Sequence, residues 1–456
     1  MTSIDFLMIL TIGIIFVCFL FLMNVVTRFS GDWFQVEKKY KNNMKADFLP
    51  EKKAPLEDCI FVGTTGKRNV YLPCNAKHVY VCGTTGSGKT VALANFIDSG
   101  MKYDFPMLII DGKGDTGRDS LLDVVKTLGE SRKVYVIDLN RPETSDKYNP
   151  FSGTSSTVIK DMLINLSTWS EEHYKLNVER YLQRVIDLIT LAEIPVTFRT
   201  IVKYIEKNAF LILSKELTQK GKLSKEQDLD NKNLSKQSGD IAESAIARFS
   251  TLLESELGTI FSDDGIDIYS ALKENAVIMF ILNPLLYPEL SPLFGNLVII
   301  DSKKAISKLY REEFKRRFFI FDEINVYASN SLLDLVNKSR SAGVTCVLAS
   351  QSLSDLSASV SEHFKNQVIE NCNNYIILRQ NSPVNAEEWA SIVGTYKTLD
   401  MTYQIDEGAS TGKGSIRKVH EFALHPDDIK KFDTGKGYIV SKDKKISCLI
   451  NINKPF

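Results

Sequence analysis

The sequence has no net charge, no closely spaced cysteine pair and few histidines. Its 56 Lys and Arg balance 56 Asp and Glu, which excludes a broadly basic protein that coats nucleic acid. Any nucleic-acid contact must therefore come from a local patch or a pore lining. The seven cysteines contain no CxxC pair, so they indicate reduced thiols rather than a disulfide framework. The five histidines lack the spacing of metal ligands, which argues against a zinc site.

The composition is that of a globular protein. Hydrophobic residues make up 44% of the chain and charged residues 25%, which argues against wholesale disorder and against a polytopic membrane protein. At about 150 residues per domain, a chain of 456 residues predicts two or three domains with a large buried core.

One long apolar run lies at the N-terminus. Residues 6–26 carry no charge and, as a helix rising 1.5 Å per residue, would span about 31 Å, the thickness of the hydrocarbon core. Asp5 precedes the run, whereas cations follow it: Arg28, Lys38, Lys39, Lys41 and Lys45. The run lacks the basic start and the cleavage site of a signal peptide. We therefore expect a transmembrane anchor over residues 1–27, a tether over residues 28–58, and the remaining body in the cytoplasm.

A glycine-rich stretch is the strongest local signal. It satisfies G-x-x-x-x-G-K-[ST] with Gly83, Thr84, Thr85, Gly86, Ser87, Gly88, Lys89 and Thr90. An apolar run precedes it and a helical pattern follows, so backbone N–H groups and the helix N-terminus would surround phosphate oxygens. Lys89 would reach the β- and γ-phosphates, and the Thr90 hydroxyl would bind Mg²⁺.

A second carboxylate motif is expected opposite this loop. Residues 317–323 form an apolar strand that ends in Asp322 and Glu323. Asp322 would hold Mg²⁺ through water, and Glu323 would orient and polarise the attacking water. An acidic pair at a strand end can also simply begin a loop, but together with Thr90 it favours nucleotide hydrolysis.

Three further polar residues follow predicted helices or strands. Gln351 directly follows the apolar run 344–350, at the edge where open α/β sheets bind ligands. It is a candidate γ-phosphate sensor, although it could equally begin a helix. Arg340 and Arg379 are candidates for an arginine finger that enters a neighbour's site, with the alternative that they are ordinary surface arginines.

Several apolar runs predict an α/β fold. Runs buried on both faces are typical of parallel core strands, and they occur at residues 106–111, 133–138, 276–283, 344–350 and 375–379. Between them, residues 155–260 carry helical apolar spacing, which predicts an inserted all-α domain. The polar, Lys-rich residues 218–239 are expected to form a solvated loop between helices, with a DNA-binding arm as the alternative. The predicted domains are 59–153 and 263–456 for the α/β motor, and 154–262 for the insertion.

The ordered motifs resemble a known family, the coupling ATPases of conjugative type IV secretion (TraD/TraG-like) within the FtsK/HerA clan. The motifs that carry the resemblance are GTTGSGKT (83–90), IIDGKGD (109–115), YNPF (148–151), FFIFDEI (318–324), SAGVTCVLASQS (341–352) and NCNNYIILRQN (371–381). The resemblance implies a RecA-like domain that hydrolyses ATP with Mg²⁺. It identifies Lys89 and Thr90 as Walker A, Asp322 and Glu323 as Walker B, and Gln351 as the motif III glutamine.

The resemblance also implies partners and a location. A hexamer in the bacterial inner membrane would pump DNA, largely independent of sequence, and deliver it with its relaxase to the inner-membrane components of a secretion channel. Two alternatives stay open. One is a motor of the same clan that moves secreted protein or chromosomal DNA. The other is a membrane receptor that binds nucleotide only to assemble, although such a receptor would not need Glu323.

Overall fold

The computed structural model describes residues 13–23, 49–50, 58–75, 77–129, 131–166, 169, 171–406 and 409–456. Residues 13–23 are helical and exposed. The other parts of the expected membrane span, residues 6–12 and 24–26, lie outside the described residues, as does most of the expected tether. Within the described ranges, no helix has both the length and the apolar character needed to cross a bilayer.

One large sheet organises the body. Its eleven strands run in the order β2-β1-β13-β12-β9-β3-β8-β7-β4-β6-β5. The strands from β9 to β5 are parallel, and the remaining neighbours are antiparallel. Their bounds are β1 Cys59–Thr65, β2 Arg68–Pro73, β3 Val79–Cys82, β4 Met107–Asp111, β5 Val134–Asp138, β6 Val277–Ile281, β7 Arg317–Asp322, β8 Val344–Ser350, β9 Asn374–Ile377, β12 Lys436–Ser441 and β13 Ile446–Ile452. The predicted α/β fold with parallel core strands is thereby confirmed.

Helices cover both faces of this sheet. Alternate residues of β4 enter different cores, with Leu108 and Ile110 in one and Met107 and Ile109 in the other. The smaller core is closed by α2 (Lys89–Lys102) and α3 (Leu121–Leu128). The larger is closed by α9 (Ile268–Lys273), α10 (Leu290–Leu309), α11 (Asn330–Ser339), α12 (Leu353–Ser359), α13 (Glu362–Asn371), α14 (Pro383–Val393) and α15 (Pro426–Lys430). Burial on both faces explains why the strands read as continuous apolar runs.

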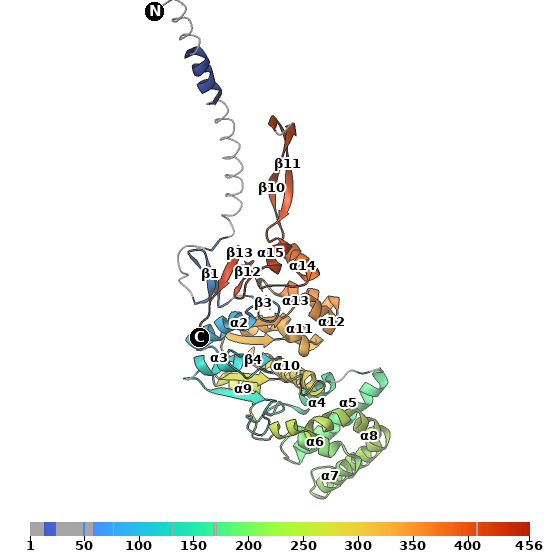
Figure 1. Ribbon diagram of the computed structural model, residues 1–456. Helices are drawn as coiled ribbons and strands as arrows, with labels where there is room; N and C mark the ends of the chain where they lie inside the picture. The colour runs from blue at the N-terminus through green and yellow to red at the C-terminus, as the bar shows by residue number, and fades with distance from the viewer. Residues whose placement is uncertain are drawn as a thin grey trace, which may run out of the picture.

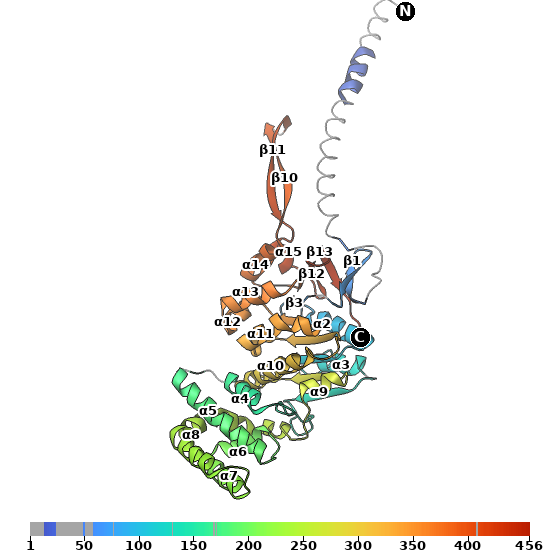
Figure 2. The ribbon, with the colours of Figure 1, turned by 180° about the vertical axis from the view of Figure 1, so that it is seen from behind.

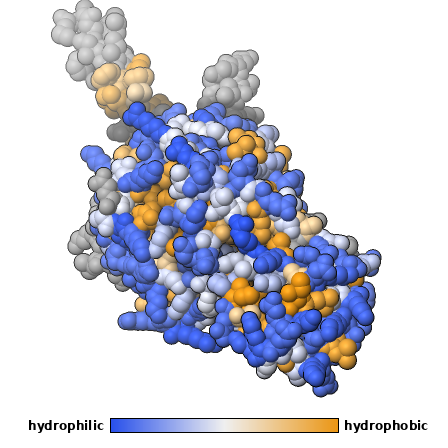
Figure 3. Space-filling model, turned by 90° about the horizontal axis from the view of Figure 1, so that it is seen from below, coloured by the Kyte–Doolittle hydropathy of each residue, from blue (hydrophilic) through white to orange (hydrophobic). Residues whose placement is uncertain are grey.

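The predicted all-helical insertion lies at one end of the molecule (Figure 1). It contains α4 (Ser156–Asn165), α5 (Glu172–Leu191), α6 (Phe198–Ile205), α7 (Lys207–Gln219) and α8 (Lys225–Glu254). The aromatic rings of Phe198 and Phe151 pack with centroids 4.6 Å apart, and join this domain to the motor. Seen from this end, the surface is mainly hydrophilic with scattered apolar patches (Figure 3), because the apolar helix faces turn inward.

The expectation of a solvated loop over residues 218–239 is wrong, because α8 begins at Lys225. Ser224 Oγ accepts a hydrogen bond from the Gln227 N–H at 3.1 Å, and Gln227 Oε1 accepts one from the Ser224 N–H at 2.8 Å, which forms a capping box. The buried face of this segment is polar: Ser214 Oγ donates to Asp228 Oδ1 at 2.7 Å, and Asn231 Nδ2 donates to Ser214 Oγ at 3.0 Å. Hydrophobic periodicity cannot detect such a face.

A long two-stranded hairpin projects from the opposite end (Figures 1 and 2). It pairs β10 (Thr395–Asp406) with β11 (Ala409–Phe422) in antiparallel register. The hairpin follows α14, whose Trp389 stacks on Tyr80 of the P-loop strand at 5.8 Å. The sequence pattern did not distinguish this hairpin from the strands of the main sheet.

A buried polar cluster ties the YNPF segment, which leads into the insertion, to α10 of the motor. Tyr148 Oη donates to Asp301 Oδ2 at 2.8 Å, and Lys304 Nζ pairs with Asp301 Oδ1 at 2.7 Å. Lys304 Nζ also donates to the Pro150 carbonyl at 2.5 Å. Asp301 is fully buried and Lys304 is buried beside it, so this carboxylate is the charged partner of a buried ammonium.

We predict that Asp301→Ala destabilises this junction by about 3–5 kcal/mol, because it leaves a buried ammonium without its charged partner. Urea unfolding followed by circular dichroism measures the loss. Asp263→Ala, at an exposed position, is the matched control and should leave the unfolding midpoint unchanged. Equal midpoints for both variants would contradict the role given to Asp301.

Candidate nucleotide site

The loop between β3 and α2 has the backbone of a phosphate cradle. Gly86 and Gly88 have φ of +74° and +107°, a region that favours glycine. A Cβ on Gly83 would lie 2.5 Å from Ser87 Oγ, so only glycine fits there as well. The Thr84 N–H donates to the Arg379 carbonyl at 3.0 Å, which fixes the start of the loop against the end of β9.

Sheet order brings the predicted site residues to one edge. Cys82, which precedes the P-loop, is paired with Ser350, which precedes Gln351. Asp322 lies on β7, directly beside β8. Because parallel strands end at the same edge, Walker A, Walker B and motif III meet there.

An ion pair forms the centre of the site. Lys89 Nζ lies 2.9 Å from Glu323 Oε1, with both side chains only 8% exposed. Gln351 Nε2 donates to the same Oε1 at 3.3 Å. Glu323 has a left-handed backbone with φ of +46°, a costly conformation for a non-glycine residue, which aims its carboxylate at the P-loop. Lys89, Glu323 and Gln351, predicted separately from sequence, are therefore in contact.

Unpartnered buried polar atoms cluster at this point. Among the described residues, Thr84 Oγ1, Ser87 Oγ and Glu323 Oε2 are buried without a hydrogen-bond partner. Buried polar atoms without partners are rare and call for an explanation such as a missing ligand. Hydroxyl and carboxylate oxygens beside a glycine-rich cradle fit a Mg²⁺–nucleotide, with Thr90 and Asp322 as the candidate metal ligands.

Two neighbouring carboxyls are strongly perturbed. Burial, together with the charges of Asp111 and Glu323, raises the pKa of Asp322 to about 7, while Lys89 opposes the rise. Burial likewise raises the pKa of Asp111 to about 6. Asp111 and Asp322 are paired across β4 and β7. A divalent cation would favour the charged form of both groups.

Sequence reasoning missed two residues that support the site. Gln380 Nε2 donates to the Gln351 carbonyl at 3.4 Å and to Cys82 Sγ at 3.5 Å. Thr434 Oγ1 donates to the Gly86 carbonyl at 2.8 Å. Gln380 follows a strand end next to Arg379, which is a usable signal. Thr434 is 348 residues from its partner, and no local pattern indicates that contact.

The structure separates the two candidate arginines. Arg379 follows the end of β9 by two residues and lies beside its own P-loop, with its Nε buried and unpartnered. Arg340 is exposed and lies before β8 (Val344–Ser350), whereas Gln351 of the nucleotide site lies directly after β8. The seven residues of β8 span about 23 Å at 3.3 Å per residue. Arg340 therefore cannot reach the nucleotide site of its own chain.

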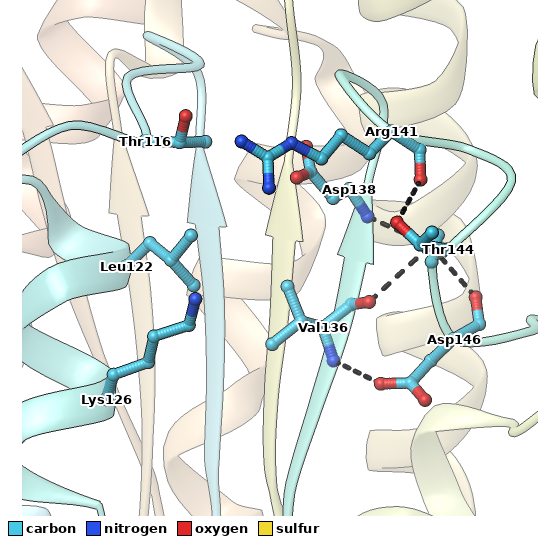
Figure 4. A pocket seen from close by; sticks show the side chains of 9 residues that line it. Thr116, Leu122, Lys126, Val136, Asp138, Arg141, Thr144 and Asp146 are labelled. Carbon is cyan, nitrogen blue, oxygen red and sulfur yellow. Dashed lines mark hydrogen bonds between the residues drawn. The ribbon is translucent and has the colours of Figure 1, made fainter.

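A second hollow, of about 230 Å³, lies at the free edge of the sheet beside β5 (Figure 4). Asp146 Oδ2 accepts from the Val136 N–H at 2.6 Å, and Ser145 Oγ accepts from the Asp138 N–H at 3.0 Å. These side chains occupy donors that would otherwise pair with another strand, which protects the edge. Arg141 and Asp138 both line the hollow (Figure 4), so its charges are mixed.

The raised pKa of Asp322 predicts a pH-dependent stability. Because its pKa is about 7 in the folded chain and 3.8 ordinarily, this carboxyl stabilises the fold fully below its ordinary pKa, and that stability is lost as the pH rises through about 7. Without nucleotide and Mg²⁺, the Tm of the wild type should fall more between pH 5 and pH 8 than that of Asp322→Asn. Differential scanning fluorimetry measures both Tm values. An equal fall in Tm for the wild type and for Asp322→Asn would show that Asp322 does not titrate in this range.

Two protein-family models match the chain. One, described as "Helicase HerA, central domain", matches residues 61–284. The other, described as "TraM recognition site of TraD and TraG", matches residues 316–434. Together they cover the whole insertion and most of both parts of the motor.

Solved structures share the fold at low sequence identity. The bacterial conjugative coupling protein TrwB in its unbound form has a TM-score of 0.66 at 16% identity, covering 88% of this chain and 90% of that chain. TrwB with ADP and Mg²⁺ gives a TM-score of 0.64 at 16% identity, covering 89% and 90%. VirB4 of Thermoanaerobacter pseudethanolicus has a TM-score of 0.56 at 11% identity, covering 88% of this chain and 98% of that chain.

A curated sequence is also similar over a short stretch. An uncharacterized protein of Mycoplasma pneumoniae is 26% identical over 129 residues, which are 28% of this chain and 83% of that protein. The structural likeness establishes a RecA-like P-loop ATPase fold. The two family models and this fold confirm the resemblance to the conjugation coupling ATPases of the FtsK/HerA clan that the ordered motifs predicted.

Proposed function

We propose that the chain is an ATP-driven DNA translocase that acts as a coupling protein. It delivers conjugative DNA, with its relaxase, to a type IV secretion channel. The observation that carries this proposal is the contact of Lys89, Glu323 and Gln351 on a fold shared with the coupling protein TrwB. The family match described as a TraM recognition site supports relaxosome partners.

The nucleotide is ATP with Mg²⁺. TrwB has been solved with ADP and Mg²⁺ and with a non-hydrolysable ATP analogue, which supports this assignment. Thr90 and Asp322 would hold the cation, which neutralises phosphate charge when bound. The P-loop N–H groups and Lys89 bind the phosphates and orient the γ-phosphate.

The ion pair positions Glu323 beside the P-loop lysine. Lys89 holds Oε1 of Glu323 at 2.9 Å, so the carboxylate is turned toward the P-loop lysine. A γ-phosphate offers Lys89 a stronger anionic partner. Glu323, still beside Gln351, then orients the attacking water and accepts its proton, while Gln351 senses the γ-phosphate.

Each site is completed by another copy of the chain. Arg340 cannot reach the site of its own chain, so it supplies charge stabilisation to a neighbour's γ-phosphate. Arg379, beside its own P-loop, acts within the same chain. This division fits a closed ring, for which the family resemblance implies six copies. A neutral chain can still line its pore with cations that contact DNA phosphates without reading bases.

The N-terminal run anchors the protein in the bacterial inner membrane, with the motor in the cytoplasm. The apolar stretch and the cations that follow it support this placement. Deletion of residues 1–27 should move the protein from the membrane fraction to the soluble fraction. An unchanged distribution of the deletion variant would contradict the anchor.

The full chain should hydrolyse ATP several-fold faster with DNA. Lys89→Ala removes phosphate binding and Glu323→Gln removes the proton acceptor, so each should lower the rate by about 100-fold or more. A phosphate-release assay with single- and double-stranded DNA measures both effects. Hydrolysis indifferent to DNA would favour protein secretion, and assembly on ATP without hydrolysis would favour the receptor.

Arg340→Ala should lower hydrolysis by about 1000-fold with unchanged binding of a fluorescent ATP analogue. Lys338→Ala, exposed on the same turn, is the matched control and should retain wild-type hydrolysis. Mixing Arg340→Ala with Lys89→Ala copies should restore part of the activity, because one copy offers a P-loop and the other an arginine. No recovery in the mixture would contradict the action of Arg340 on a neighbour.

A further inference from the structure

We propose that copies of this chain assemble head to tail through two small apolar patches. One patch lies where the parallel strands end, and the other lies where they begin. Tyr310 and Phe314 of one copy pack on Leu285 and Leu286 of the next. The inference rests on the proposed ATPase function, since it describes how two copies complete that site. It names the contact surface, which neither the family matches nor the motifs indicate.

The leucine patch lies at the edge that carries the nucleotide site. Leu285 is 93% exposed and Leu286 is 60% exposed, in the loop that follows β6. The Leu282 N–H donates to the Asp111 carbonyl at 2.9 Å, which ties this loop to the strand beside Walker B. Because only β4 separates β6 from β7, the leucines follow a strand about 10 Å from Asp322.

The aromatic patch lies at the other edge, around Arg340. Tyr310 is 46% exposed and Phe314 is 68% exposed, in the loop before β7. Tyr310 Oη donates to the Lys338 carbonyl at 2.5 Å. A Cβ on Gly343 would lie 3.2 Å from Phe314 Cε2. Both rings therefore flank the turn that presents Arg340.

The reach of Arg340 dictates which edges meet. Arg340 lies where the strands begin, and the nucleotide site lies where they end. Since Arg340 serves another copy, the side of one chain where its strands begin must face the side of its neighbour where the strands end. The aromatic loop extends from this arginine toward β6, because its Glu312 pairs with Lys273 of α9 at 3.2 Å. The leucine loop follows β6, so it is displaced from the nucleotide site across the sheet toward β6, the same direction as the aromatic loop. Facing edges thus place the two patches opposite each other.

Charged side chains rim both patches. Arg311 and Lys315 are exposed beside Phe314 together with Glu312 and Glu313, and Glu289 is exposed in the leucine loop. Glu312 already pairs with Lys273, which leaves Arg311 and Lys315 to meet Glu289. A small apolar contact rimmed by opposite charges is typical of protein interfaces. Because the two faces differ, the contact is heterologous, which is the kind of contact that builds a cyclic ring.

The test is sedimentation velocity of the full chain in detergent, with a non-hydrolysable ATP analogue. Wild type should assemble, whereas Leu285→Asp and Phe314→Asp should remain monomeric while binding the analogue with wild-type affinity. Leu229→Asp, a leucine 57% exposed on α8 of the insertion, is the matched control and should assemble. Intact nucleotide binding shows that the variants are folded.

Mixing the two variants gives a specific signature. Leu285→Asp keeps the aromatic face and Phe314→Asp keeps the leucine face, so the mixture should form dimers that cannot grow. Variants that assemble like wild type, a mixture without dimers, or a monomeric wild type would each overturn the inference. Wild-type assembly with hydrolysis indifferent to DNA would instead overturn the proposed function and leave this interface standing.

Discussion

The buried ion pair between Lys89 and Glu323 is the contact on which the site depends. Each charge would be costly to bury alone, and the pair is tolerated because its atoms lie 2.9 Å apart. The contact requires the P-loop turn that directs Lys89 and the left-handed backbone of Glu323. It also requires a sheet in which only β8 separates β3 from β7. The fold thus holds Lys89 and Glu323 together at the place where a phosphate can replace Glu323 as the partner of Lys89.

This exchange links chemistry to assembly. A phosphate that attracts Lys89 releases Glu323 for water, but the developing charge still needs a cation. Arg379 lies beside the P-loop of its own chain, whereas Arg340 lies a strand-length from the site of its own chain. In the proposed mechanism Arg340 serves a neighbour, so hydrolysis depends on contact between copies, and the exposed apolar patches are the surface proposed for that contact.

Much of this site could be predicted from sequence, because its signals are local. The P-loop requires glycine at positions where the backbone has a positive φ angle, and strands buried on both faces of the sheet must be apolar throughout. Helix α8 was missed because its buried face is polar, with Asn231 and Ser214 hydrogen bonded to each other. The contact of Thr434 with the P-loop and the separate positions of Arg340 and Arg379 arise only from tertiary folding.

Cryo-electron microscopy of the full chain with DNA and a non-hydrolysable ATP analogue tests the central claim most directly. The account predicts a closed ring in which Lys89 contacts the γ-phosphate and no longer Glu323, and in which each γ-phosphate meets Arg340 of the adjacent copy. A ring with Lys89 still paired to Glu323, or with Arg340 turned away from every nucleotide, would contradict it.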